Sequence, residues 1–293
     1  MSKVLYEKLL TSLKRSNKER KLKLAKEAGY TTVEDYKKYL ESQISSVLEV
    51  EFEEVKVEGN LTDMVIAFDT TGSMNSYIDA VKQHVKDLIP KLFSQNPGLK
   101  ISVVAFGDYC DMTSATVFGN AYQVINLTNN ENGLISFVNT AEQTSGGDSD
   151  EFYELVIQKI TNETEWREGS GKSVLLIADC NPHKKGYRYS SKYSQSPDWK
   201  EEAQKAAEKG IIFDTLQIIP RYDWYKELSQ ITGGVCLPFK NSAKTADLIE
   251  ATSLGRGGKA TRSAFMAKSV SKEVTMDGDM NAVYGMYKTV VKK

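Results

Sequence analysis

The segment MVIAFDTTGSM, residues 64–74, holds the clearest candidate for chemistry in this chain. Its first five residues carry no charge and predict a strand that is buried on both faces. Asp69, Thr71 and Ser73 follow, so one carboxylate and two hydroxyls gather where a central strand turns into a helix. These oxygen ligands suit a hard divalent cation such as Mg²⁺ better than zinc or copper. Because ligands of open α/β sheets collect at the carboxyl ends of the strands, we predict a metal site here.

The composition is that of a folded, water-soluble protein. The chain has 293 residues, of which 40% are hydrophobic and 26% charged, enough for one large α/β domain with appendages. The net charge of −1 argues neither for nor against nucleic acid, although both ends are basic and the middle is acidic. Three widely spaced cysteines fit a reducing compartment. Without a recognisable signal peptide or membrane span, we expect a cytoplasmic protein.

Hydrophobic patterning divides the chain into four predicted parts. Residues 1–48 form a basic helical extension, and residues 49–60 a linker or edge strand. From 61 to 254, strand-like runs alternate with amphipathic helices, which predicts an α/β fold: a doubly wound, mostly parallel sheet with helices on both faces. Residues 255–293 form an irregular basic tail that begins at a glycine-rich joint.

The expected elements of the 61–254 part follow from the period of their apolar residues. Turn residues such as Asn96-Pro97-Gly98 and Gly210 separate them. The expected strands are 64–68, 100–106, 121–127, 174–178, 211–219 and 235–239, and the expected helices are 76–94, 131–143, 149–162, 198–209 and 222–231.

Two further segments carry oxygen ligands to the same expected edge of the sheet. The glycine turn at 144–148 reads TSGGD, and an aspartate directly follows the strand at 174–178. Because the carboxyl ends of neighbouring parallel strands lie at one edge, these side chains are expected to meet those of the first loop. Mg²⁺ keeps several waters, which leaves a position for an outside ligand. The predicted metal set is Asp69, Thr71, Ser73, Asp148 and Asp179.

This series of motifs resembles a von Willebrand factor type A domain with a metal-ion-dependent adhesion site. DTTGSM at 69–74 matches that family's Asp-x-Ser/Thr-x-Ser loop. GGDSDE at 146–151 and DCNPH at 179–183 are similar to the second and third loops of a subgroup found in bacterial proteins and beside atypical kinases, with asparagine where proline is usual. ITGG at 231–234 also looks like the family's approach to its last strand. The resemblance covers about residues 61–254 and explains neither basic end.

The resemblance implies a non-enzymatic protein-binding module that depends on Mg²⁺, with Mn²⁺ or Ca²⁺ as alternative ions. The basic head and tail indicate that it acts in an intracellular assembly. Thr71 and Ser73 would hold the metal directly, and Asp69, Asp148 and Asp179 directly or through water. An Asp or Glu of a protein partner would complete the coordination shell, because a cation held mostly by neutral hydroxyls keeps positive character. We expect no membrane partner.

One alternative is an enzyme. FDTTGS is similar to the phosphorylated-aspartate loop of haloacid-dehalogenase-type phosphotransferases and phosphatases, in which Asp69 would be the nucleophile beside Mg²⁺. Gly107-Asp108-x-x-Asp111 would then pass for their acidic loop. Against this interpretation, position 70 is Thr rather than Lys, and the acidic stretch comes early in the chain.

The other alternative is a nucleic-acid-associated protein that uses its basic ends. The polar insertion at 183–197 would add to it, because tyrosines alternate there with lysines and arginine. We favour recognition of a protein partner by this insertion, since it lies on the predicted metal face. The candidate partner-binding residues are Thr144, His183, Tyr187 and Tyr189.

Overall fold

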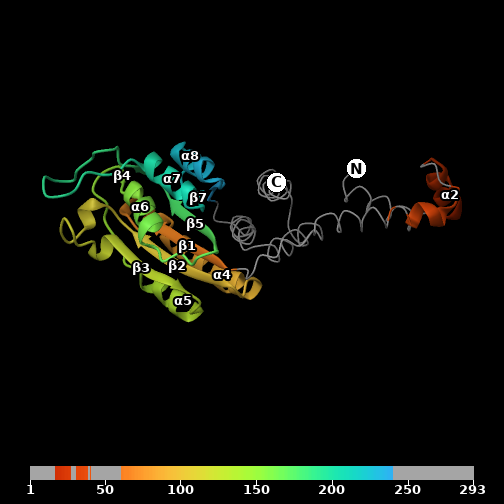
Figure 1. Cartoon of the computed structure of the whole chain (residues 1–293), viewed down its shortest axis with the longest axis horizontal. Helices are drawn as coiled ribbons and strands as arrows, with labels where there is room; N and C mark the ends of the chain where they lie inside the picture. Colours follow the sequence, from red (N-terminus) through yellow and green to blue (C-terminus); the bar gives the residue numbers. More distant parts are fainter. Residues whose placement is uncertain (1–16, 28–30, 39, 41–60, 240–293) are drawn as a thin grey trace. The chain divides into compact units, whose positions relative to one another are not determined.

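The computed structural model describes residues 17–27, 31–38, 40 and 61–239 (Figure 1). The described residues up to 40 fall in one compact unit and residues 61–239 in another. The first unit contains α2 (Lys18–Glu27) and a short helix at 33–38. Thr32 caps the short helix, because its hydroxyl accepts a hydrogen bond from the backbone N–H of Asp35 at 3.1 Å. The predicted linker at 49–60 and the tail at 255–293 lie outside the described residues.

The larger unit is built on a six-stranded sheet in the order β3-β2-β1-β5-β7-β8. The parallel strands are β1 (Thr62–Asp69), β2 (Leu99–Phe106), β5 (Gly171–Ala178), β7 (Ile211–Gln217) and β8 (Cys236–Pro238). At the edge, β3 (Tyr122–Thr128) pairs antiparallel with β2. The predicted doubly wound, mostly parallel sheet is confirmed.

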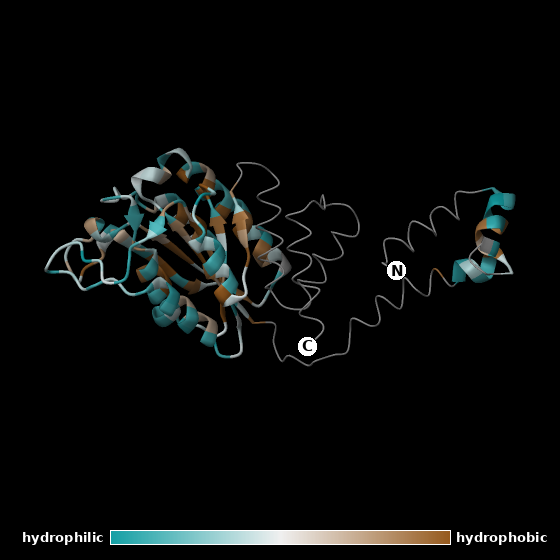
Figure 2. Ribbon diagram, turned by 90° about the horizontal axis from the view of Figure 1, so that it is seen from above, coloured by the Kyte–Doolittle hydropathy of each residue, from teal (hydrophilic) through white to brown (hydrophobic). Residues whose placement is uncertain are grey.

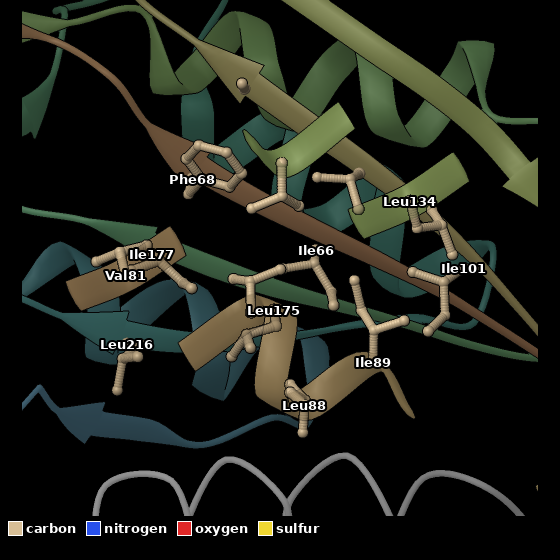
Figure 3. Close-up of a cluster of buried hydrophobic side chains, with 14 of the residues drawn as sticks. Ile66, Phe68, Val81, Leu88, Ile89, Ile101, Leu134, Leu175, Ile177 and Leu216 are labelled. Atoms are coloured by element: carbon tan, nitrogen blue, oxygen red, sulfur yellow. The ribbon is translucent and has the colours of Figure 1, made fainter. Parts of the chain in front are cut away.

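Helices α4 (Ile78–Gln95) and α5 (Glu131–Thr140) cover one face of the sheet. Alternate residues of the strands point to this face, where Ile66, Phe68 and Leu175 meet the apolar stripe of α4 (Figure 3). The stripe that was expected on a helix over 76–94 therefore lies in the core.

Helices α6 (Tyr153–Glu163), α7 (Trp199–Glu208) and α8 (Trp224–Thr232) cover the other face. The intervening residues of the strands, such as Val65 and Val174, pack against them in a second buried cluster. Since side chains of both faces are buried, the central strands read as continuous apolar runs. Figure 2 shows this as brown strands between helices that are teal on their outer sides.

Two element boundaries beside the predicted site differ from the sequence-based expectation. The helix expected over 76–94 begins two residues later, after the 3₁₀ helix η1 (Gly72–Ser76). The start of a helix at 149 was wrong, because β4 (Asp150–Glu151) pairs there with β6 (Asn181–Pro182), in parallel. This pairing links the second predicted loop to the third.

No helix in the part of the chain that the structure describes is long and apolar enough to cross a membrane.

A buried ion pair holds the amino end of β1 in place. Asp63 has no exposed surface, and the guanidinium of Arg167 donates to its Oδ1 at 2.7 Å. Arg167 Nη2 also donates to the backbone carbonyls of Thr62 and Gly98, each at 2.8 Å, which joins the starts of β1 and β2.

We expect Arg167→Ala to lower the free energy of unfolding by roughly 3 kcal/mol, because it leaves the buried Asp63 carboxylate without its counter-charge. Denaturation by urea measures the change. Arg188→Ala, which removes an exposed arginine, is the matched control and should change stability by less than about 0.5 kcal/mol. Equal stability of the two variants would contradict the structural role of Arg167.

Candidate metal centre

The predicted metal ligands lie where the strand order of the sheet reverses. β1 and β5 are neighbours, but the chain leaves β1 toward β2 and leaves β5 toward β7. Asp69 is the last residue of β1, and Asp179 directly follows β5. Because the loops after these strands diverge, the edge of the sheet is open between the two aspartates, the usual ligand position in such folds.

Asp69 is fully buried, and three donors hold its carboxylate. The backbone N–H and the hydroxyl of Thr71 each donate to Oδ1 at 2.7 Å. The hydroxyl of Tyr153, from the first turn of α6, donates to Oδ2 at 2.5 Å. The carboxylate is therefore fixed in position by its own loop and by the helix that packs behind it.

A chain of hydroxyl contacts joins the two aspartates. Thr71 Oγ1 lies 3.2 Å from Ser73 Oγ, and Ser73 Oγ donates to Asp179 Oδ1 at 3.1 Å. Ser73 is exposed whereas both aspartates are buried, so this group of side chains opens to solvent at the serine. The structure thus brings together Asp69, Thr71, Ser73 and Asp179, as predicted.

The donor set of this group fits a hard cation. Asp179 Oδ2 is buried without a hydrogen-bond partner among the described residues, which is costly unless a further group satisfies it. Burial and repulsion by the neighbouring Asp179 raise the pKa of Asp69 to about 7. A bound cation would offset this repulsion. No three His, Cys, Asp or Glu side chains within 61–239 or the shorter described ranges are arranged to hold a metal. A cation would therefore need hydroxyl ligands, which Thr71 and Ser73 supply.

Asp148 and Thr144 do not contact this group. Asp148 is exposed, and it accepts hydrogen bonds from the backbone N–H of Asp150 and from the hydroxyl of Tyr187. Thr144 lies behind the first loop, with its Oγ1 3.1 Å from that of Thr70 and its N–H bonded to the Thr70 carbonyl. The second loop therefore supports the site through Thr144, while Asp148 faces the insertion.

Glu151 is the second-loop carboxylate that faces Thr71, and sequence reasoning missed it. A Cβ on Gly146 would lie 2.8 Å from Glu151 Oε1 and 3.3 Å from Thr71 Cβ, so the two side chains meet across this glycine. Burial and the charges of Asp69 and Asp108 raise the pKa of Glu151 to about 10. Its Oε2, like Oδ2 of Asp179, is buried without a hydrogen-bond partner in the described part. The GGDSDE motif contained the signal, but not which acid points inward.

Asp111 fixes the glycine turn of the second loop. Its Oδ1 accepts from the N–H of Ser145 at 2.9 Å, and its Oδ2 accepts from Gly146 N at 3.1 Å and Asp108 N at 3.0 Å. Asp108 and Asp111 also form a capping box on a 3₁₀ turn, η2 (Tyr109–Asp111). The stretch considered as an acidic loop thus anchors backbone N–H groups next to the site.

Of the remaining candidate partner-binding residues, His183 is buried and Tyr189 is exposed. His183 Nε2 lies 2.8 Å from Asp108 Oδ1, and its backbone N–H donates to Glu154 Oε2 at 3.1 Å. The ring of Tyr187 stacks on His183 with centroids 3.8 Å apart. His183 and Tyr187 therefore hold the insertion on the body of the domain, whereas the exposed ring of Tyr189 packs edge-on against Tyr193, with centroids 5.3 Å apart.

The family model of the von Willebrand factor type A domain matches residues 63–251. A protein of Acanthamoeba polyphaga mimivirus, whose name describes it as an ariadne-like RING finger protein, is 22% identical over 191 residues, 60% of this chain and 18% of that protein. The structure of the pilus adhesin SpaC from Lactobacillus rhamnosus GG, in its open conformation, matches at 14% identity with a TM-score of 0.48, covering 74% of this chain and 30% of the adhesin. This chain spans less than a third of either protein.

The buried cluster around His183 generates a prediction for stability against pH. Burial raises the pKa of Glu154 from 4.5 to about 8, so the folded state keeps a proton that the unfolded chain loses. The stability from this group is complete below pH 4.5 and disappears as the pH rises through about 8. Burial alone would lower the pKa of His183, but its hydrogen bond to Asp108 and nearby carboxylates raise it. The raised pKa of His183 therefore also makes the folded state less stable as the pH rises.

Glu154→Gln should therefore flatten the fall in unfolding free energy between pH 5 and pH 8 by up to about 1.4 kcal/mol per pH unit. Urea denaturation in EDTA across this range measures the slope for both proteins. Glu208→Gln, at an exposed position of α7, is the control and should keep the wild-type slope. A variant slope as steep as that of the wild type would rule out Glu154 as the linked group.

Proposed function

Because this chain belongs to the von Willebrand factor type A domain family, we propose that it is a Mg²⁺-dependent protein-binding module of an intracellular assembly. The family supports a protein-interaction role in general. The metal dependence, the cytoplasmic location and the absence of an enzymatic activity belong to our proposal. Mn²⁺ or Ca²⁺ are alternative ions.

The observation that carries the proposal is the continuous series of contacts from Asp69 through Thr71 and Ser73 to Asp179. It ends in a buried carboxylate oxygen that no described group satisfies. All of its side chains offer oxygen, and the exposed Ser73 marks the side from which a ligand enters. These are the properties that a site for a hard cation requires.

In this proposal Thr71, Ser73 and Asp179 hold the cation, and Asp69 orients Thr71 by accepting from both its N–H and its hydroxyl. The bound cation supplies a positive charge that attracts a carboxylate from a protein partner. Tyr153 keeps Asp69 in place from the side of α6, and thus acts on the site only through that carboxylate. An Asp or Glu of the partner is the expected ligand.

We expect Mg²⁺ to raise the unfolding free energy of the full chain by about 2.7 kcal/mol at a concentration a hundred times its Kd. Asp179→Asn should abolish this stabilisation and metal-dependent capture of the partner. Its fold should persist in EDTA, because the charge repulsion with Asp69 disappears. Thermal unfolding with and without Mg²⁺ measures the effect.

Asp87→Asn is the matched control, since Asp87 is an exposed aspartate on α4 and should respond to Mg²⁺ like the wild type. Stabilisation of Asp179→Asn by Mg²⁺, or partner capture that persists in EDTA, would contradict the proposal.

The second loop offers a separate comparison. Glu151→Gln should weaken Mg²⁺ binding by more than Asp148→Asn does, because Glu151 faces Thr71 whereas Asp148 is exposed and bonded to Tyr187. Isothermal titration with Mg²⁺ measures both affinities under the same conditions. A larger loss from Asp148→Asn would mean that the second loop rearranges when the metal binds.

A further inference from the structure

We infer that the partner of this metal site is an acidic peptide segment with a bulky apolar side chain, which enters a cavity between α6 and the insertion at 183–197. The inference rests on the proposed function, and it names the partner's chemistry. It follows from the cavity, from the charges on the insertion and from the contacts that connect the two.

The cavity has a volume of about 310 Å³ and lies between η2, the loop at 112–118, α6 and the end of the insertion. This volume is at the small end of ligand sites, so the cavity suits a side chain rather than a large cofactor. Its apolar lining comes from η2, the loop, α6 and the insertion, and Gln158, Ser194 and Gln195 add uncharged polar groups. The apolar residues are Tyr109, Met112, Ala115, Phe118, Leu155, Tyr193 and Pro197.

The one cation in the lining of the cavity is already compensated. Lys159 Nζ lies 2.6 Å from Glu163 Oε2, and it is 4.2 Å and 4.8 Å from the ring centroids of Phe118 and Tyr122. Because the carboxylate and two aromatic faces satisfy this ammonium group, it does not call for an anion inside the cavity. An apolar side chain is therefore the better occupant.

The insertion, in contrast, presents exposed positive charge. Lys184, Arg188 and Lys192 are exposed and form no ion pair in the described part of the chain, whereas Lys185 pairs with Glu201. Such a group attracts acidic segments and increases their rate of association. The same segment would carry the carboxylate that the metal site requires.

Contacts within the insertion hold it in a defined shape. The N–H of Gly186 donates to the Ser196 carbonyl at 3.0 Å, and the N–H of Ser196 donates to the Tyr187 carbonyl at 2.8 Å. These bonds close the base of the loop, so its cations and the cavity wall near Tyr193 are presented together.

The insertion also connects the cavity to the second loop of the metal site. Tyr109 lines the cavity, and its ring centroid lies 5.8 Å from that of Tyr187. The hydroxyl of Tyr187 donates to Asp148. Asp148 lies two residues after Gly146, the glycine across which Glu151 and Thr71 meet. The inference requires that one bound segment extends along this connection from the cavity to the metal site.

The packing of the aromatic residues favours a peptide over nucleic acid. Tyr187 stacks on His183, and Trp199 packs against Trp224. Tyr193 lines the cavity, so these three rings are not free to stack on bases.

Fluorescence anisotropy with the full chain tests this inference, using a labelled glutamate-rich peptide with one central tryptophan and the same peptide with alanine instead. In Mg²⁺, the tryptophan peptide should bind about tenfold more tightly to the wild type, which corresponds to 1.4 kcal/mol. Ala115→Trp, which fills the cavity, should remove this preference and keep Mg²⁺ binding. Gln195→Trp, at an exposed position of the lining, repeats the test if the first variant does not fold.

Arg188→Glu should weaken both peptides, whereas Lys226→Glu, an exposed charge reversal on α8, should weaken neither. Equal affinity for both peptides, or a preference for the tryptophan peptide that survives both cavity-filling variants, would overturn the inference. The proposed function would still stand if Mg²⁺ stabilised the protein in the same experiment. A tryptophan preference that persists in EDTA would support the cavity and count against the metal mechanism. Tighter binding of random single-stranded DNA in Mg²⁺ would overturn the assignment of the partner to peptides.

Discussion

Burial of the Asp69 carboxylate is the constraint on which the site end of this domain depends. A charged group without exposed surface is tolerated only when donors surround it. Those donors come from two directions, since Thr71 lies on the loop after β1 and Tyr153 on α6. The Tyr153 hydroxyl also accepts from the backbone N–H of Cys180, after β5. Satisfying one carboxylate therefore fixes the first loop, the third loop and a helix relative to each other.

The second loop is held by a different device, in which a side chain satisfies backbone groups. Asp111 binds N–H groups of Ser145 and Gly146, and β4 pairs with β6 beside them. Gly146 adopts a φ of 69°, a conformation that side chains disfavour, and a Cβ there would collide with Glu151. The glycine thus permits close contact of the second loop with Thr71, and its presence in the motif has a structural reason.

The sequence predicted the fold because long apolar strands and a striped helix such as α4 leave strong periodic signals. It also predicted the group formed by Asp69, Thr71, Ser73 and Asp179, since the order of parallel strands brings their carboxyl ends together. It did not distinguish Asp148 from Glu151. Which of them points inward is decided by β4, a strand of two residues that is too short to produce an alternating pattern. The backbone contacts of Asp111 leave no signal in residue spacing at all.

The same contacts bear on how a cation at this site would attract a partner. Thr71 and Tyr153 already engage both oxygens of Asp69, so its charge acts on the site mainly through the Thr71 hydroxyl. Burial and neighbouring carboxylates favour the neutral form of Glu151. Asp179 and Glu151 each keep an oxygen without a hydrogen-bond partner in the described part, and Asp179 is the one that Ser73 contacts. A divalent ion bound by one carboxylate and two hydroxyls keeps a net positive charge, and this charge is what selects an acidic segment.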